Sequence, residues 1–249
     1  MITLSIVSHQ HGDLVRSLLA DLQKFCGHHS LFVILTLNLS ETLSFPRDAF
    51  SFPLLIIENA RPKGFAANHN QAFARARGDL FGVINPDIRF SADPLDPLCD
   101  LLSNNPQIGV AAPLVRNPAG GTEDNARRFP TPGRILKRIL SRKNALDYPI
   151  RPRSFPVDWL AGLFLFFPRA VFSRINGFDE RYFLYCEDID ICARLRLSGF
   201  EARLHPGITV IHQARRHSHR NPTYLRWHII SLARFFNSEV YAALRPRFL

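Results

Sequence analysis

The sequence contains no apolar run long enough to cross a bilayer, for which about 18 to 20 residues are needed. Its longest run, residues 159–167, has the length of a strand and ends at Pro168. The opening segment, MITLSIVSHQ, lacks the basic-then-apolar order of a secretory signal peptide. We therefore expect a cytoplasmic protein, and we leave open a peripheral contact with the inner face of the cell membrane.

The sequence has only four cysteines, and no two of them stand at CxxC spacing. A chain of 249 residues in which 46% are hydrophobic can build a large core without disulfides. We therefore expect Cys26, Cys99, Cys186 and Cys192 to be buried, reduced thiols.

The histidines near the C-terminus lack the companion cysteines and the spacing of a zinc finger. They are His205, His212, His217 and His219. A single histidine near a strand end is more often structural than a ligand. We keep only His212, at the end of a predicted strand, as a candidate metal ligand.

Acidic residues are outnumbered, with 21 Asp and Glu against 31 Lys and Arg, which gives a net charge of +10. Such a field attracts polyanions, anionic membranes and phosphorylated substrates. A basic nucleic-acid-binding protein is therefore one alternative. Against it, the basic residues are spread along the chain and no helix-turn-helix, zinc-finger or RNA-recognition signature is present, so no nucleic acid is expected as a partner.

Short apolar segments alternate with segments of helical period in the first half of the chain. Strands are predicted at 2–7, 31–37, 54–57, 80–84 and 108–112, and helices at 15–25, 66–76 and 94–102. This alternation predicts an α/β fold with a mostly parallel sheet covered on both faces. Ligands of such sheets bind beyond the carboxyl ends of the strands, where Ser8-His9-Gln10, Glu58-Asn59-Ala60 and Asn85-Pro86-Asp87 fall.

The second half of the chain opens with a segment of weak periodicity, 117–156, rich in Pro, Gly and Arg. We expect long loops there that flank the site, with one short helix near 135–140. Strands are predicted at 157–167, 201–204 and 208–211, and helices at 169–175 and 187–197. The tail, 222–244, reads as a helix with one apolar face: Leu225, Ile229, Leu232 and Phe236.

The tail follows a basic stretch that contains Arg215, Arg216, His217 and Arg220. A basic segment beside an amphipathic helix can lie on an anionic lipid surface. The alternative is a helix that packs on the domain and leaves a solvated basic face.

The tripeptide Asn85-Pro86-Asp87 directly follows an apolar strand. A carboxylate in that place points to the ligand-binding edge of the sheet, and a hard divalent cation on it can bridge two phosphates. The alternative is a plain turn, because Asn, Pro and Asp all favour turns.

The segment 61–70, RPKGFAANHN, leads into a predicted helix. Gly64 permits a tight turn, and the N-terminus of a helix offers unpaired N–H groups to an anion. Asn68 and Asn70 can cap the helix or bind a ligand. The GxxxxGK spacing of a P-loop is absent, and the alternative is a helix cap with solvated Arg61 and Lys63.

The segment Tyr185-Cys186-Glu187-Asp188-Ile189-Asp190 places three carboxylates at a predicted helix start. The helix dipole favours negative charge there, so capping is one interpretation. Adjacent carboxylates in aromatic surroundings also supply general bases. Side chains of Glu187 and Asp188 point about 100° apart on a helix, so one can face a ligand while the other holds the fold.

Six motifs follow one another along residues 2–218. They are Val7-Ser8, the segment from Gly64 to Asn70, Asn85-Pro86-Asp87, Trp159-Leu160-Ala161-Gly162, Gly177-Phe178-Asp179-Glu180 and Glu187-Asp188-Ile189-Asp190. Their order resembles the family 2 glycosyltransferases, in the rhamnosyltransferase-like branch, with residues 159–212 as the most specific part. The resemblance implies a GT-A fold, which is Rossmann-like, an inverting reaction, and Mg²⁺ or Mn²⁺ as cofactor.

The resemblance also implies roles for single residues. Asp87 stands at the position of the last carboxylate of the family's DxD motif, and Asn85 replaces the first carboxylate. Asp188, paired with Glu187, is the implied catalytic base. The implied donor-binding residues are Val7, Ser8, Glu58, Lys63, Gly64, Asn70, Asn85 and Asp87. The implied acceptor-binding residues are Trp159, Gly162, Asp179 and Glu180, with Trp159 as a wall for sugar rings. The metal ligands would be Asp87 and His212.

Two positions depart from the family's pattern. Glu58 stands where many members carry an Asp that contacts the base or ribose, and His9-Gln10 replaces the usual pair after the first strand. We also expect the helix dipole to keep Asp188 ionised at neutral pH and to weaken it as a base.

The expected organisation is one GT-A domain, 1–221, followed by a C-terminal amphipathic helix, 222–249. Its nucleotide-binding half is about 1–115 and its acceptor-binding half about 157–221. The expected donor is dTDP-rhamnose or a related dTDP- or UDP-sugar, and the acceptor a glycan or polyprenyl-linked hydroxyl in cell-surface polysaccharide synthesis. One alternative is a sugar nucleotidyltransferase, although the Gly-rich signature of such enzymes near the first strand is absent. Another alternative is a related fold that has lost activity.

Overall fold

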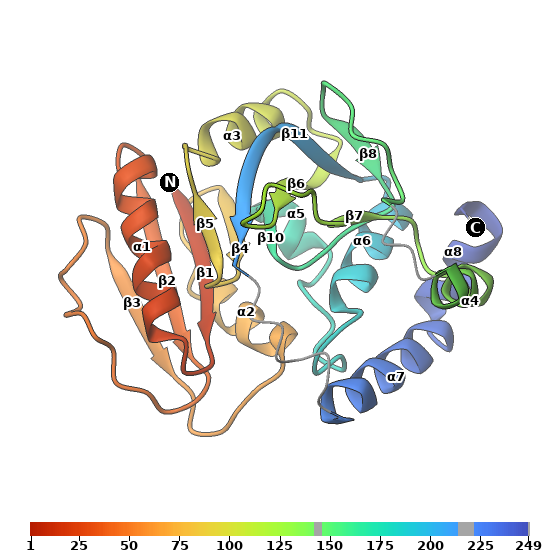
Figure 1. Cartoon of the computed structure of the whole chain (residues 1–249), viewed down its shortest axis with the longest axis horizontal. Coiled ribbons are helices and arrows are strands. Elements are labelled where there is room, and N and C mark those ends of the chain that lie inside the picture. The colour runs from red at the N-terminus through yellow and green to blue at the C-terminus, as the bar shows by residue number, and fades with distance from the viewer. Residues whose placement is uncertain (142–145, 214–221, 249) are drawn as a thin grey trace.

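A computed structural model describes residues 1–141, 146–213 and 222–248 (Figure 1). The strands are β1 (Ile2–Ser8), β2 (Leu31–Leu37), β3 (Leu54–Glu58), β4 (Leu80–Ile84), β5 (Ile88–Phe90), β6 (Ile108–Arg116), β7 (Ala126–Arg127), β8 (Phe155–Val157), β9 (Trp159–Leu160), β10 (Phe164–Pro168) and β11 (Glu201–His212). The helices are α1 (Gly12–Cys26), α2 (Phe65–Phe73), α3 (Leu95–Ser103), α4 (Pro132–Ser141), α5 (Arg169–Arg174), α6 (Glu187–Leu197), α7 (Pro222–Phe236) and α8 (Glu239–Phe248).

A nine-stranded sheet runs through the molecule in the order β3-β2-β1-β4-β10-β6-β11-β5, with β8 paired to β11. The first four strands are mutually parallel, as are β6 and β11. Strand β10 runs antiparallel to β4 and to β6, so it begins at the edge of the sheet where β4 ends. This edge therefore collects the ends of β1, β4 and β11 together with the segment that precedes β10.

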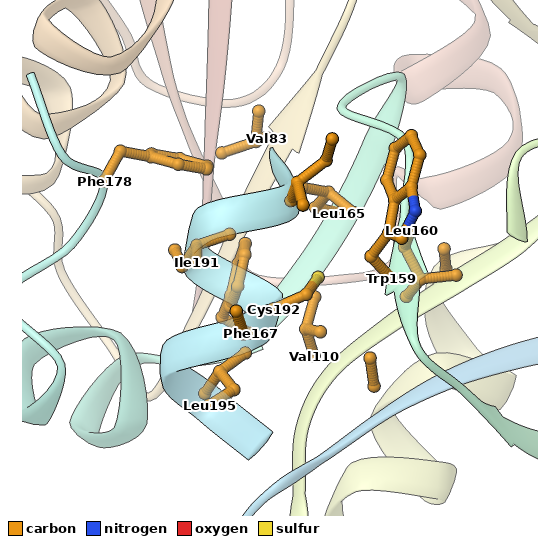
Figure 2. Close-up of a cluster of buried hydrophobic side chains, with 14 of the residues drawn as sticks. Val83, Val110, Trp159, Leu160, Leu165, Phe167, Phe178, Ile191, Cys192 and Leu195 are labelled. Atoms are coloured by element: carbon orange, nitrogen blue, oxygen red, sulfur yellow. The ribbon is translucent and has the colours of Figure 1, made fainter. Parts of the chain in front are cut away.

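Two large hydrophobic clusters, and a smaller one formed by Phe32, Ile34, Ile57 and Ala72, cover the two faces of the sheet, as the predicted α/β layering requires. Strand β10 shows the alternation directly, because Phe164 and Phe166 belong to one cluster while Leu165 and Phe167 belong to the other. Figure 2 shows the second cluster, in which helix α6 lays its apolar side against Leu165 and Phe167. This packing fixes the direction of α6 and hence the place of its N-terminus.

Strand β11 is one twelve-residue strand where the sequence predicts two short ones. The interval His205-Pro206-Gly207 looks like a break, but the strand passes it with a shift of register against β6 between His205 and Thr209. A β-bulge of this kind absorbs extra residues without ending the pairing. The strand therefore carries His212 to the carboxyl edge of the sheet.

The tail differs from the predicted single amphipathic helix, because it forms two helices that are separated at Asn237-Ser238. The buried side chains of α7 are Ser231 and Phe235, whereas Leu225 and Ile229 of the predicted apolar face are exposed. The basic stretch with Arg215, Arg216, His217 and Arg220, and His219 within it, lies outside the described residues.

The four cysteines are free thiols, as expected, although Cys99 is only half-buried. Among the described residues, no helix combines the length and the apolar character needed to span a bilayer. The central sheet includes strands of both predicted halves, and the division into a nucleotide-binding and an acceptor-binding half stays a prediction.

Candidate functional site

The loop after β4 and the N-terminus of α6 meet across the short segment that precedes β10. The backbone N–H of Asn85 donates to the carbonyl of Leu163 at 2.9 Å. The neighbouring Gly162 donates its N–H to Oδ2 of Asp188 at 3.1 Å. Two consecutive residues thus connect Asn85-Pro86-Asp87 on one side with Asp188 on the other, although about a hundred positions separate the two motifs.

Asp87 forms a charged cluster with His212 and Glu123. The ring of His212 lies with Nε2 3.1 Å from Oδ2 of Asp87 and Nδ1 2.7 Å from Oε2 of Glu123. The antiparallel pairing of β5 with β11 sets His212 opposite Ile88, directly after Asp87. The side chain of Asp87 is 23% exposed, that of His212 14% and that of Glu123 27%, so a ligand can reach the cluster.

The electrostatics of this cluster suit a cation. Burial of the His212 ring opposes its charge, but hydrogen bonds and charge from Asp87 and Glu123 outweigh burial and raise its pKa to about 9. Oδ1 of Asp87 is buried without a hydrogen-bond partner in the described part of the chain. Such an orphaned oxygen costs about 1–3 kcal/mol unless something binds it. With this pKa the His212 ring is protonated at neutral pH, so a divalent metal ion held by Asp87 and His212 would have to displace the Nε2 proton.

Helix α6 begins after two consecutive residues in the left-handed region, Tyr185 with φ 70° and Cys186 with φ 66°. Neither is a glycine, so this turn is strained, at about 1–3 kcal/mol for each residue. Strain of this kind persists only where the surroundings hold it, and it often marks functional sites. Here it aims the first turn of α6, with Glu187 and Asp188, at Gly162.

Burial governs the acid–base chemistry of the two carboxyl groups. It raises the pKa of both Glu187 and Asp188, and the nearby Asp188 charge raises that of Glu187 further. The Asp188 anion is supported by N–H groups of Gly162 and Ile189 and by Arg127, whereas Oε2 of Glu187 has no partner among the described residues. Of the pair, Glu187 is therefore the group that binds a proton more readily, and Asp188 the one whose anion is better supported.

The expectation that Asp188 is a weakened base is therefore wrong. The helix dipole was expected to lower its pKa and to weaken it as a base, but burial exceeds that effect and raises the pKa. A carboxylate with a raised pKa accepts protons more readily, which favours Asp188 as a general base.

The side chains of Asn38, Asn59 and Asn68 form a hydrogen-bonded network that contacts the backbone of Lys63, one of the predicted donor-binding residues. Asn38 pairs with Lys63 through both its amide oxygen and its nitrogen, each at 2.8 Å. Asn59 donates to the side-chain oxygens of Asn38 and Asn68 at 2.8 and 2.7 Å. Asn38, which sequence reasoning missed, thereby holds the 59–64 segment against the end of β2, and its position just beyond a strand end was the available signal.

Ser8 and Val7 stand at the end of β1. The hydroxyl of Ser8 accepts the N–H of His11 at 3.0 Å, and Val7 is buried in the strand. Glu58 is well exposed and lies 3.7 Å from Arg47. The Lys63 ammonium group contacts Gln71, and the Asn85 side chain is half-buried.

Two of the predicted donor-binding residues hold the segment 178–183 in place. A Cβ on Gly64 would lie 2.5 Å from the carbonyl oxygen of Phe183, so only glycine permits this approach. Asn70 donates to the carbonyl of Phe178 and accepts its N–H, at 2.8 and 3.0 Å. Both residues are engaged within the protein, and we assign them to the support of the site.

The predicted acceptor-binding residues divide into core and surface. Trp159 is only 8% exposed, donates Nε1–H to the carbonyl of Arg128 and points into the core cluster (Figure 2), so it forms no open wall for a sugar ring. Asp179 pairs with the Arg181 side chain at 2.6 Å and accepts the backbone N–H of Arg181, so it caps a turn. Glu180 accepts from Asn70 at 3.0 Å.

Glu123 is the functional candidate that sequence reasoning missed entirely. It lies in the weakly periodic segment after β6, its N–H donates to the carbonyl of Val115 on β6 at 2.9 Å, and the pairing of β6 with β11 brings His212 to it. The same loop reaches the segment before β10, because Ala161 donates its N–H to the carbonyl of Asn125 at 2.9 Å. The loop thus connects the Asp87 cluster with the Asp188 side of the site.

Residues 17–162 match the family described as "Glycosyl transferase family 2", and residues 150–220 match the "N-terminal domain of galactosyltransferase". The rhamnosyltransferase WbbL of Escherichia coli (strain K12) is 29% identical over an alignment of 249 residues, and the match covers 94% of this chain and 92% of that protein. The N-acetylglucosaminyl-diphospho-decaprenol L-rhamnosyltransferase of Mycobacterium tuberculosis (strain ATCC 25618 / H37Rv) is 32% identical over an alignment of 152 residues, and the match covers 56% of this chain and 48% of that protein.

Solved structures confirm the predicted GT-A fold. GalNAc-T7 with UDP, GalNAc and Mn²⁺ superposes with a TM-score of 0.70 at 15% identity, over 89% of this chain and 45% of that one. The Pyrobaculum calidifontis mannosyltransferase PcManGT with GDP-Man and Mn²⁺ gives 0.64 at 15% identity, over 98% and 67%.

Proposed function

Because the chain belongs to glycosyl transferase family 2, it is a glycosyltransferase, and we propose that it transfers rhamnose from dTDP-rhamnose to a lipid-linked glycan acceptor with inversion. The similarity to WbbL over nearly the whole chain supports the sugar. The name of the mycobacterial relative supports an acceptor carried on a polyprenyl diphosphate. Family membership favours this activity over nucleotidyl transfer and over nucleic-acid binding.

The observation that carries the proposal is the contact between the Asp87 loop and Asp188 through Leu163 and Gly162. An inverting transferase needs a diphosphate-binding group and a base on opposite sides of one sugar carbon. The two consecutive residues before β10 bring the candidates for both roles to one edge of the sheet.

On the donor side, Asp87 and His212 would hold the divalent metal ion, and Glu123 orients the His212 ring from its other nitrogen. The ion, Mg²⁺ or Mn²⁺, would supply positive charge to the departing diphosphate. The carboxyl ends of β1 and β3, with Ser8 and Glu58, are proposed to receive the ribose and the base.

On the acceptor side, Asp188 removes the proton from the attacking hydroxyl group as the oxygen bonds to the anomeric carbon. The N–H groups of Gly162 and Ile189 each donate to one carboxylate oxygen of Asp188, at 3.1 and 2.9 Å, and together they fix the orientation of the group. Attack from the face opposite the diphosphate inverts the configuration. Neutral Glu187 acts as a positioning residue, because a second charge beside Asp188 would be costly in this buried place.

The experiment that tests the function is a thermal-shift screen of nucleoside diphosphate sugars with Mn²⁺. Selective stabilisation by a dTDP-sugar supports the donor, and incubation with a polyprenyl-diphosphate glycan then identifies the product. Release of free nucleoside diphosphate supports glycosyl transfer, whereas release of pyrophosphate would identify a nucleotidyltransferase. Stabilisation by DNA alone would overturn the proposal.

Glu187→Gln is expected to keep kcat within about threefold of the wild type and to leave the acid limb of the pH profile in place. Glutamine mimics the protonated acid, so the charge beside Asp188 does not change. In both proteins the rate should fall as pH falls through the raised pKa of Asp188, because protonation removes the base. A pH series of kcat checks this, and a loss of more than about a hundredfold would show that Glu187 works as an anion.

We also propose a peripheral contact with an anionic membrane through α4, which lies at the end of the molecule away from β3 (Figure 1). Leu136 and Leu140 are 58% and 73% exposed, beside basic residues that include Arg134 and Lys137. The ion pair of Arg138 with Asp124, at 2.5 Å, ties this helix to the loop that carries Glu123. A lipid-linked acceptor would thus arrive near the site.

Leu136→Glu with Leu140→Glu is expected to weaken binding to vesicles of anionic phospholipid at least about tenfold, because each buried leucine contributes about 1.5–3 kcal/mol. Vesicle co-sedimentation measures this. Ile150→Glu is the matched control, since Ile150 is also exposed but lies outside α4. Equal binding of the double variant and the control would remove α4 from the contact.

A further inference from the structure

Four side chains converge at the opposite edge of the sheet, away from the site described above. His28 and His29 lie in the turn between α1 and β2, and Asp93 and Asp96 lie between β5 and the first turn of α3. One ligand atom from each of the four falls within 4.8 Å of the others. The proposed transferase mechanism uses none of these residues.

The distances between histidine nitrogens and carboxylate oxygens in this cluster lie close to the spacing of ligand atoms around a metal ion. His28 Nε2 lies 3.3 Å from Oδ2 of Asp93 and 3.4 Å from Oδ2 of Asp96. His29 Nε2 lies 2.9 Å from Oδ2 of Asp93 and 3.3 Å from Oδ1 of Asp96. A tetrahedral ion with bonds of about 2.0–2.1 Å has ligands about 3.3 Å apart.

Hydrogen bonding alone accounts for only part of this arrangement. Each Nε2 carries at most one hydrogen, yet each faces two carboxylates, and three of the four separations exceed the usual 2.7–3.2 Å range. The two imidazole rings lie side by side with centroids 4.2 Å apart, so both present Nε2 to the same pair of carboxylates.

The surroundings hold the cluster in a defined orientation. Oδ1 of Asp93 accepts the N–H of Leu95 at 2.7 Å and the thiol of Cys26 at 3.2 Å, which leaves Oδ2 directed to the two histidines. The N–H of His29 donates to the carbonyl of Cys26 at 3.0 Å and fixes the turn. Supporting contacts of this kind orient the ligands of protein metal sites.

We propose that His28, His29, Asp93 and Asp96 form a tetrahedral zinc site. Two imidazole nitrogens and two carboxylate oxygens suit Zn²⁺, whereas Mg²⁺ prefers an all-oxygen, octahedral shell. Four protein ligands complete the tetrahedron and leave no position for a substrate, so the ion is structural.

The proposed zinc site joins the end of α1 to the segment after β5, the strand that begins next to Asp87. Asp93 follows β5, and β5 directly follows Asp87 and pairs with the end of β11 that carries His212. Arg89 on β5 is already tied to Asp21 of α1 at 2.6 Å. A zinc ion would add a second tie between the end of α1 and the end of β5, and would stabilise the folded chain by mass action.

The test uses the untagged full-length chain with Asp87→Asn and His212→Gln as background, so that the other cluster binds no metal. Zn²⁺ is expected to bind with one-to-one stoichiometry by calorimetry and to raise the unfolding temperature, and Mg²⁺ is expected to do neither. Co²⁺ should give the visible absorption bands of a tetrahedral site. His29→Gln and Asp93→Asn should weaken Zn²⁺ binding more than about a hundredfold, since even supporting contacts are worth about 10- to 100-fold.

His28→Gln keeps the test decisive if the more buried variants fold poorly, because the His28 side chain is 57% exposed. It should fold normally and still weaken Zn²⁺ binding, while His205→Gln, at a half-exposed histidine of β11, should bind as the background does. Unchanged Zn²⁺ affinity in His28→Gln and His29→Gln, or Zn²⁺ binding lost in His205→Gln, would overturn the proposal. None of these measurements depends on sugar transfer.

Discussion

Asp188→Asn is expected to lower kcat for sugar transfer by about a thousandfold, within the range of 10²–10⁴ that a positioned general base contributes. Asparagine has nearly the same shape and still accepts the N–H of Gly162 through its amide oxygen. It cannot accept the proton of the attacking hydroxyl group. The dissociation constant for nucleoside diphosphate should therefore stay within about threefold, and steady-state kinetics with calorimetry separates the two quantities.

Asp100→Asn is the matched control for this prediction. Asp100 is an exposed acid on α3, and its replacement makes the same chemical change away from the site. It should leave kcat and unfolding temperature unchanged. If Asp188→Asn transferred sugar with the same kcat as this control, Asp188 would not be the base. The raised pKa values of Glu187 and Asp188 would then reflect their burial and have no role in the reaction.

Asp87→Ala is expected to weaken Mn²⁺-dependent binding of the nucleoside diphosphate about a hundredfold, since loss of a metal ligand costs at least as much as loss of its supporting contacts. The variant removes the orphaned Oδ1 and the partner of His212 Nε2 together. Binding measured with EDTA should then differ little between the variant and the wild type. Titration calorimetry with and without Mn²⁺ gives both comparisons.

Asp79→Ala provides the control, because Asp79 is exposed and stands just before β4, whereas Asp87 follows the end of the same strand. Wild-type affinity is expected for it. His212→Gln should resemble Asp87→Ala in direction. Equal affinities for wild type and Asp87→Ala in Mn²⁺ would remove the metal role from this cluster.

Periodicity and strand-end chemistry predicted much of this protein. The alternation of strands and helices up to β6, the α4 helix and the start of α6 all lie near the predicted ranges. These predictions succeeded because a buried strand or an amphipathic helix shows a recognisable pattern of apolar and polar residues within its own short segment of sequence. Asp87 and Asp188 could be singled out as candidates for the same reason, since each directly follows or begins an element with a clear period.

Other features depend on partners far along the chain. The break at 205–207 was bridged because β11 pairs with β6 on both sides of the bulge, and pairing of that kind leaves no local signal. The tail separated into two helices, and its Leu225 and Ile229 remained exposed. Glu123 joined the Asp87 cluster from a loop without periodicity, and the zinc cluster assembled from two turns more than sixty positions apart.

Local chemistry therefore told which residues could act: a carboxylate after a strand, an acidic pair at a helix start, a glycine before a helix. Burial and long-range contact decided where these side chains lie and which groups surround them. Trp159 is buried in the core, and Asn70 donates to the backbone carbonyl of Phe178. The pKa of Asp188 rose where the helix dipole alone would lower it. The reason is that desolvation and ion pairing depend on what surrounds a group in space, and most of those neighbours are remote in sequence.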